Sequence, residues 1–254
     1  MSLTIKTPEQ VEKMRMAGGL VAQTLMMLHD MVRPGITTEE LNKAADAFIR
    51  SKGGVPSFLG YNGYPKSICT SVNAQVVHGI PGEYALRDGD IVSADVGAIL
   101  FGWHGDAART FYVGEVAPEV KRLCEVTKEC FFEGIKFAKP GFHIADISAA
   151  IEKHATSFGY GVVRELTGHG IGTHMHESPS IPNFVDSRDG RGVKLVKGMT
   201  LAIEPMINLG RRDVWQLADG WTVETRDKLQ SAHYENTIVV TENEPELLTL
   251  TRGC

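Results

Sequence analysis

The spacing of apolar residues predicts two helices at the start of the chain. Thr7-Pro8-Glu9-Gln10 is typical of a helix N-terminus, with Thr7 as the cap and Gln10 completing a capping box. Apolar residues then recur at helical steps until Arg33-Pro34-Gly35 ends the helix. A second amphipathic helix is expected from Thr37 to the glycine pair at 53–54. Three strand-like segments follow, at 67–72, 91–100 and 106–113.

The same order of elements recurs further along the chain. A helix is expected from Pro118, and Lys139-Pro140-Gly141 ends it at an offset of 106 residues from Arg33-Pro34-Gly35. A second helix over 146–154 and strands at 200–207 and 235–241 follow. The repetition indicates a duplicated unit, and hence one domain over 1–254 whose halves, about 1–115 and 116–254, are related by a pseudo-twofold axis. The polar runs 209–220 and 224–232 are expected to be a loop insertion in the second copy.

Composition narrows the class of protein. The chain has 254 residues, 43% of them apolar, and a net charge of −5 without a basic run, which argues against a nucleic-acid or anionic-membrane partner. The apolar stretches are too short for a transmembrane helix, and the N-terminus lacks the long apolar stretch of a signal peptide. Cys69, Cys124, Cys130 and Cys254 form no C-x-x-C pair. We therefore expect a cytoplasmic protein with reduced thiols.

Two aspartates inside apolar strands are the first sign of chemistry. Asp95 and Asp106 lie in neighbouring strand-like segments, and Leu100-Phe101-Gly102 between them reads as a hairpin turn. If the turn centres near residues 100 and 101, the two aspartates face each other directly. Like charges in that position are destabilising, so a cation, a shared proton or solvation is required.

The second copy supplies matching acids. Glu204 lies within the apolar run 201–207, and Glu235 opens the strand at 235–241. Four carboxylates cannot all be ionised in one dry site without positive charge, and divalent metals supply it. His169, flanked by glycines, offers a nitrogen ligand. Such an oxygen-rich set suits Mn, Fe(II), Co or Mg, and bridging carboxylates would give a two-metal site that activates water toward a carbonyl or phosphoryl group.

Other catalytic signatures are missing from the sequence. It contains no H-E-x-x-H, Walker A, G-x-S-x-G or G-x-G-x-x-G motif. This excludes zincins, P-loop enzymes, serine hydrolases and nucleotide-dependent oxidoreductases of the usual kinds.

Seven motifs together resemble one family over nearly the whole chain. They are Gly60-Tyr61-Asn62-Gly63-Tyr64-Pro65-Lys66-Ser67, His78-Gly79-Ile80-Pro81, Ser93-Ala94-Asp95-Val96, His104-Gly105-Asp106, Gly168-His169-Gly170-Ile171-Gly172, Ala202-Ile203-Glu204-Pro205-Met206 and Tyr234-Glu235-Asn236-Thr237. In these motifs the chain resembles the type I methionine aminopeptidases in their short bacterial form. The resemblance implies the pita-bread fold of mixed α/β (α+β) class, in which two pseudo-twofold-related αβ halves surround a central curved antiparallel sheet.

The resemblance also implies roles for individual residues. The five implied ligands of a dinuclear centre are Asp95, Asp106, His169, Glu204 and Glu235, with Asp106 and Glu235 bridging. His78 and His176 would contact the scissile peptide. The implied pocket for the methionine side chain is formed by Tyr61, Tyr64, Cys69 and Trp221.

The chain departs from the family's commonest pattern at several positions. Phe58 and Met175 stand where other pocket residues often occur, which puts the pocket's shape in question. Gly97 and Ala107 replace residues that often carry a hydroxyl. His233 stands where Gln is usual, and could be a hydrogen-bond donor behind the ligands, a proton relay or a solvated surface residue.

The implied activity is removal of the initiator methionine from nascent polypeptides, with a preference for a small second residue. Two divalent ions, of Co, Mn, Fe(II) or Zn, would activate the attacking water, with Glu204 accepting its proton and His176 stabilising the oxyanion. Nascent peptides beginning with Met would be the substrates, ribosome contact would be transient, and a monomer is expected.

Three alternatives remain. A proline- or creatine-directed enzyme of the same fold usually carries an additional N-terminal domain, for which 254 residues leave no room. A binding protein that has lost catalysis would lack ligands that are intact here. A metal-dependent oxygenase is remote, because four carboxylates and one histidine do not make a two-histidine facial triad.

Overall fold

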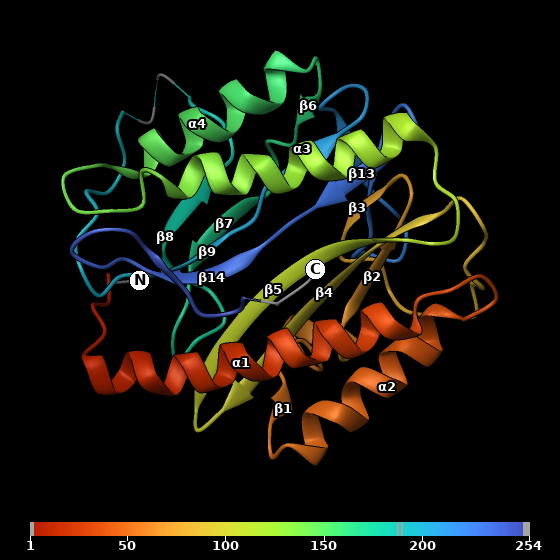
Figure 1. Ribbon diagram of the computed structural model, residues 1–254, viewed down its shortest axis with the longest axis horizontal. Helices are drawn as coiled ribbons and strands as arrows, with labels where there is room; N and C mark the ends of the chain where they lie inside the picture. Colours follow the sequence, from red (N-terminus) through yellow and green to blue (C-terminus); the bar gives the residue numbers. More distant parts are fainter. Residues whose placement is uncertain (1–2, 187, 189, 251–254) are drawn as a thin grey trace.

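Helices and antiparallel strands alternate in the computed structural model, which describes residues 3–186, 188 and 190–250 (Figure 1). The first helix pair is α1 (Pro8–Met31) and α2 (Thr38–Ser51), and the predicted capping box of Thr7 and Gln10 is formed at α1. The second pair is α3 (Pro118–Ile135) and α4 (Ile144–Ser157), so α4 begins two residues before the predicted range. The helix prediction is therefore confirmed, apart from small shifts at the ends.

The 106-residue offset recurs in the backbone. Gly35 and Gly141 both have positive φ, at 91° and 97°, between the helices of each pair. Thr37 and His143 then serve as the N-caps of α2 and α4. The two helix pairs therefore enter and leave their turns in the same way, as a duplicated unit requires. The proposed division near residue 115 stays a prediction.

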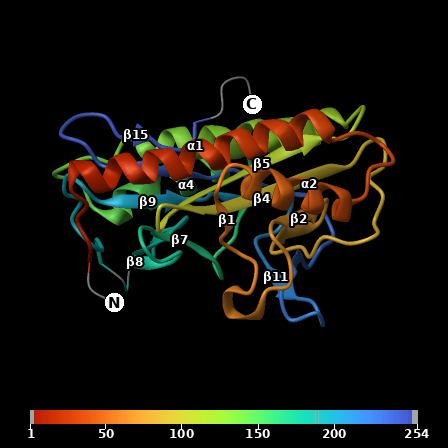
Figure 2. The ribbon, with the colours of Figure 1, turned by 90° about the horizontal axis from the view of Figure 1, so that it is seen from below.

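The described residues form four antiparallel sheets in addition to the two helix pairs. The sheet of the first half contains β1 (Val55–Pro56), β2 (Cys69–Val72), β4 (Ile91–Leu100) and β5 (Trp103–Tyr112). The five-stranded sheet of the second half has the order β15 (Glu246–Leu247), β14 (Asn236–Val239), β9 (Thr200–Ile203), β7 (Thr167–Gly170) and β8 (Glu177–Pro182). In the side view, α1 runs along the upper side of the molecule, and β7, β8 and β11 lie toward the lower side (Figure 2).

Two small sheets correct the predicted loop insertion. One contains β6 (Gly161–Val162), β10 (Met206–Asn208) and β13 (Ser231–His233), and the other contains β3 (Gln75–Val77), β11 (Val214–Gln216) and β12 (Val223–Thr225). The runs 209–220 and 224–232 are therefore partly strand. The prediction of a loop was wrong there, because strands of three residues are too short to show an alternation of apolar and polar residues.

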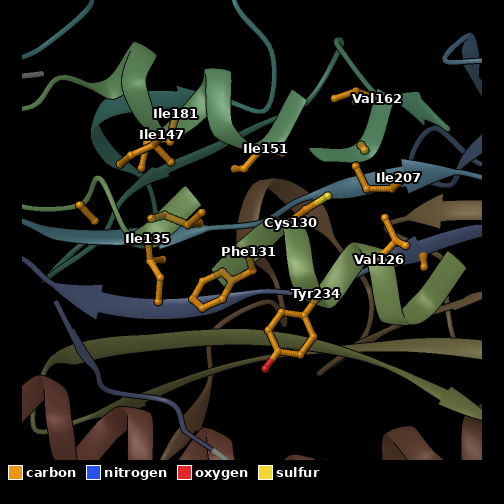
Figure 3. Packing of buried hydrophobic residues seen from close by; sticks show 14 of the residues in the cluster. Val126, Cys130, Phe131, Ile135, Ile147, Ile151, Val162, Ile181, Ile207 and Tyr234 are labelled. Carbon is orange, nitrogen blue, oxygen red and sulfur yellow. The ribbon is translucent and has the colours of Figure 1, made fainter. Parts of the chain in front are cut away.

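The core is divided between the halves. In the second half, Ile147 and Ile151 of α4 pack with Cys130 and Phe131 of α3 (Figure 3). A separate buried cluster joins α1 and α2 to β4 and β5. Each helix pair thus covers strands of its own half, and β5 meets β14 beside Asp106.

The β4–β5 hairpin corrects the predicted pairing of the aspartates. The turn consists of Phe101 and Gly102, both with positive φ, at 52° and 78°. Asp95 consequently pairs with Ala108, and Asp106 pairs with Gly97. The aspartates are diagonal neighbours on one face of the sheet and do not face each other directly, because the turn is centred one residue later than supposed.

Cysteines and membrane character can be checked on the described part of the chain. Cys69, Cys124 and Cys130 are buried free thiols, and Cys254 lies outside the described residues. None of the helices in that part is both long and apolar enough to cross a bilayer.

Candidate metal centre

Every residue predicted for the site lines one cavity of about 220 Å³. The lining combines acids and histidines with aromatic and apolar side chains. The lining residues are Phe58, Tyr61, Asn62, Tyr64, Cys69, His78, Asp95, Asp106, His169, Met175, His176, Glu204, Trp221 and Glu235.

The first half contributes its acids from regular strands. Asp95 lies in β4 and Asp106 in β5, on the same face of the hairpin. The backbone N–H of Asp106 donates to the Thr237 hydroxyl at 3.0 Å, and that hydroxyl donates to the Asp106 carbonyl at 2.9 Å. Thr237 belongs to β14, so this pair of bonds ties the hairpin to the second half beside the acids.

The second half contributes its acids from breaks between strands. Glu204 and Pro205 separate β9 from β10, and Asn183 donates to the Glu204 carbonyl at 2.9 Å. Glu235 precedes β14, and its N–H donates to the Ala108 carbonyl of β5 at 3.0 Å. Both glutamates therefore lie outside the paired strands, where their longer side chains can reach the β4–β5 hairpin.

His169 has one ring nitrogen free for a ligand. Its Nδ1 lies 2.9 Å from the Gly170 carbonyl, which can only accept, so Nδ1 carries the proton. Its Nε2 lies 3.7 Å from Asp106 Oδ2 and 3.7 Å from Glu204 Oε1. The lone pair of Nε2 thus points among the carboxylates, as in a metal-binding histidine.

Burial and mutual repulsion disfavour ionisation of the acids. Burial raises the pKa of Asp95 to about 7. Burial, reinforced by the Asp95 charge, raises the pKa of Asp106 well above its ordinary value. Burial and neighbouring carboxylates also raise the pKa of Glu204 and of Glu235. Without added positive charge this cluster therefore holds protons near neutrality.

The donor set fits divalent cations. Asp106, His169 and Glu235 each offer a ligand atom, and the three atoms lie within 4.8 Å of one another. Among the described residues, Asp95 Oδ1, Asp106 Oδ1 and Glu235 Oε1 are buried without a hydrogen-bond partner. Buried polar atoms ordinarily find partners, and orphaned carboxylate oxygens around a bare imidazole nitrogen are what oxygen-preferring ions satisfy.

An apolar wall adjoins the acids. Phe58, Tyr64, Cys69 and Met175 form one buried cluster, and Trp221 packs against Tyr64 with ring centroids 5.1 Å apart. This wall explains one departure from the family pattern. A Cβ on Gly97 would lie 2.6 Å from Phe58 Cε1, so the ring of Phe58 takes the place of a side chain at 97.

Two further histidines flank the cavity. His176 Nδ1 lies 2.7 Å from the Tyr61 hydroxyl, and its ring centroid lies 4.2 Å from that of His169. His78 has a positive φ of 60°, and its ring meets Trp221 edge-on. Burial, with a contribution from His176, lowers the pKa of His78 to about 4, so His78 is neutral at pH 7.

His233 is buried, which excludes the surface alternative. Its residue exposure is 2%, and Nε2 lies 3.8 Å from Glu204 Oε2 and 4.0 Å from Glu235 Oε2. Burial lowers its pKa to about 3, so the ring is neutral at pH 7. The remaining interpretations place it behind the acids.

Sequence reasoning missed two residues at the site. Asn62 lines the cavity from the short 3-10 turn Tyr61–Gly63. It belongs to the motif at 60–67, but no role was predicted for it. Arg109 is buried, donates to the Glu235 carbonyl at 2.6 Å and bonds Asn236 Oδ1 at 2.7 Å. It is a charge inside an apolar strand, the same signal that identified Asp95.

Comparison with known proteins decides the family. The model of metallopeptidase family M24 matches residues 12–242. The chain belongs to this family. This M24 peptidase is 51% identical over 249 residues to the methionine aminopeptidase of Clostridium acetobutylicum, covering 98% of this chain and 99% of the relative. The crystal structure of methionine aminopeptidase from Rickettsia prowazekii superposes with a TM-score of 0.95 at 47% identity, covering 98% of this chain and all of that one.

A more distant neighbour supports the fold alone. Prolidase from Pyrococcus furiosus matches this M24 peptidase with a TM-score of 0.78 at 23% identity, covering 98% of this chain and 66% of that one. The predicted pita-bread fold and the resemblance to methionine aminopeptidases are both confirmed. As a metallopeptidase, the protein requires a divalent metal cofactor.

Proposed function

We propose that this protein removes the N-terminal methionine from polypeptides whose second residue is small. The observation that carries the proposal is the cavity itself, in which two buried carboxylates, two half-buried ones and His169 adjoin a wall of aromatic and thioether side chains. The full-length similarity to methionine aminopeptidases supports the same substrate.

The residues that would hold the metal are Asp95, Asp106, His169, Glu204 and Glu235. Two divalent ions bound there, of Co, Mn, Fe(II) or Zn, would supply the positive charge that ionises the acids and the Lewis acidity that activates water. The chain's own contribution is a fixed set of ligands. Two acids sit on the β4–β5 hairpin. The other two are anchored at their backbone carbonyls, which accept hydrogen bonds from the side chains of Asn183 and Arg109.

Glu204 is the acid best placed to move a proton. Its side chain is 14% exposed, against 5% for Asp106 and 2% for Glu235, so it has the freest access to the cavity of these three. Ionised in the metal-loaded protein, its carboxylate could accept the proton that the water gives up. We assign Glu204 the acceptance of the water proton and its delivery to the leaving amine.

His78 and His176 would orient the scissile peptide. His78 is neutral at pH 7 and can donate or accept one hydrogen bond to the peptide group. His176 is held by Tyr61 through Nδ1, which leaves Nε2 available for the oxyanion that forms on the methionine carbonyl.

The apolar wall would bind the methionine side chain. Tyr61, Tyr64, Cys69 and Trp221 offer aromatic and sulfur contacts to a polarisable thioether. Phe58 and Met175 complete the wall in this chain. Crowding beside the acids would restrict the second substrate residue to small side chains.

The cellular setting follows from the substrate. Newly made chains beginning with methionine are produced in the cytoplasm, so we propose a cytoplasmic monomer that meets them during transient association with the ribosome.

A variant of His78 tests the proposal. His78→Ala should lower turnover of a Met-Ala peptide by about 10- to 100-fold, because peptide orientation is lost, while the bound metal measured by mass spectrometry stays at the wild-type amount. Wild-type protein should cleave Met-Gly and Met-Ala peptides and leave x-Pro peptides intact. Cleavage of x-Pro peptides alone would assign the prolidase activity instead, and binding without any cleavage in Mn, Fe(II) or Co would assign a binding protein.

A further inference from the structure

An ion pair outside the cluster of acids ties the start of the chain to the cavity. Lys6 Nζ lies 2.6 Å from Glu177 Oε2, and the two side chains are 4% and 6% exposed. Thr4 donates to the same oxygen at 2.5 Å. Glu177 directly follows His176, so the N-terminal segment contacts the loop that carries a proposed catalytic histidine.

The glutamate closes a turn around the cavity residues. Its other oxygen, Oε1, accepts from the His174 N–H at 3.2 Å. Met175 and His176 are the two residues inside this turn, and both line the cavity. One carboxylate therefore fixes the beginning of the turn and anchors its end to the N-terminal segment.

The backbone around the Lys6–Glu177 pair leaves room for it and holds Lys6 in place. A Cβ on Gly172 would lie 2.4 Å from Glu177 Oε1 and 2.8 Å from Lys6 Cε, so a side chain there would displace the pair. Lys6 is itself fixed by its N–H, which donates to the Gly198 carbonyl at 2.8 Å. Burial works to raise the pKa of Glu177, but the bonds from Lys6 and Thr4 outweigh it and the pKa lies below the ordinary value.

We infer that Lys6 is a positioning residue, which acts through Glu177 to hold Met175 and His176 in register with the metal-binding acids. This inference rests on the proposed function, because His176 acquires its role there. Removing the ammonium group leaves a buried carboxylate without its counter-charge, and such a group either draws in water or moves. Either response loosens the turn over residues 174–177.

The loosening can be measured without activity. Lys6→Met keeps an unbranched apolar stem as far as Cε and removes the ammonium group with its charge. Amide hydrogen exchange over residues 172–177 should become at least about fivefold faster in this variant, because the local opening is no longer restrained. Ile151→Ala serves as the control: it removes a buried side chain between α3 and α4, lowers the melting temperature and should leave exchange over 172–177 unchanged.

A double-mutant cycle tests the link to His176. Lys6→Met should lower kcat for a Met-Ala-Ser peptide by about tenfold in the wild-type background and less than about twofold in His176→Ala, because there is no imidazole left to position. An equal loss in both backgrounds, or unchanged exchange over 172–177, would overturn the inference. If Lys6→Met fails to fold, Thr4→Val removes one donor to the same oxygen and should give the same pattern at about two- to threefold.

Failure of the proposed function is a separate result. If the wild-type protein cleaves no methionyl peptide with any of the added divalent metal ions, the proposed function is contradicted. The exchange experiment would still decide whether Lys6 restrains the loop.

Discussion

The two halves of the molecule deliver their acids by different means. In the first half, Asp95 and Asp106 project from uninterrupted strands, β4 and β5, each of 10 residues. In the second half, Glu204 and Glu235 lie at breaks, one between β9 and β10 and the other just before β14. Short side chains suit a ladder whose backbone already approaches the site, and longer ones suit breaks that lie further away. If the halves arose by duplication, as the sequence predicts, the position of the acids was kept while side-chain length compensates for a different backbone.

The comparison of the two halves assumes that acids from both are needed for activity, and variants of one acid from each half test this. Asp106→Asn and Glu235→Gln should each lower kcat/KM for a Met-Ala peptide by at least about 100-fold. Residues that merely support metal ligands cost 10- to 100-fold, and these two are themselves buried among the proposed ligands. Activity assays with parallel metal analysis would check this. Glu125→Gln, on the exposed face of α3, is the control and should change neither quantity. A large loss from one variant and none from the other would assign the site to a single half.

A second prediction separates charge repulsion from metal binding. Between its ordinary pKa of 3.8 and its folded value of about 7, Asp95 binds more protons in the folded state than in the unfolded state. Stability of the metal-free protein therefore falls as the pH rises through this window. Metal-free Asp95→Asn should be more stable than metal-free wild type at pH 8, by on the order of 1–3 kcal/mol, and the difference should shrink toward pH 4.

Adding metal should reverse that order. Mn or Co at about 100 times its dissociation constant stabilises the wild type by about 2.7 kcal/mol, a rise in melting temperature of roughly 5–10 °C. Asp95→Asn should gain much less. Thermal melts at pH 8 with and without metal provide the measurement, and equal shifts in both proteins would contradict the role of Asp95.

The smallest effect concerns the equivalent N-caps. Thr37 accepts from the Glu40 N–H through Oγ1 at 3.1 Å, whereas His143 Nδ1 is buried without a hydrogen-bond partner among the described residues. Thr37→Ala should lower the free energy of unfolding by about 1 kcal/mol, and His143→Ala by less than half of that. Urea denaturation measures both, and a greater loss at His143 would show that the caps have exchanged importance.

Much of the site could be predicted from the sequence, because its residues interrupt the apolar pattern of the strands around them. Charges inside apolar strands identified Asp95, Asp106 and Glu204, and the flanking glycines identified His169. The register of the aspartates was not readable, since placing the turn one residue earlier changes which residues pair. Nor was the Lys6–Glu177 pair, because its partners are 171 residues apart and each looks like an ordinary surface charge in the sequence.

The fold followed a similar division. Capping boxes and long amphipathic repeats predicted the four α-helices of the described chain to within a few residues. The short strands β11, β12 and β13 were missed, because their stability comes from pairing with β3 and β10 and not from their own composition.

The two-residue turn between β4 and β5 constrains how this chain can vary. Phe101 is 63% exposed, so its ring is not needed for packing, but its φ of 52° favours residues that tolerate a left-handed backbone. The number of residues between the turn and Asp106 is also constrained. One residue inserted or deleted within β5 before Asp106 would send every later side chain of the strand to the opposite face. Asp106 would then point away from Asp95, with the composition of the chain almost unchanged. In this hairpin, the number of residues between the turn and Asp106 therefore constrains the site more than the side chain at Phe101 does.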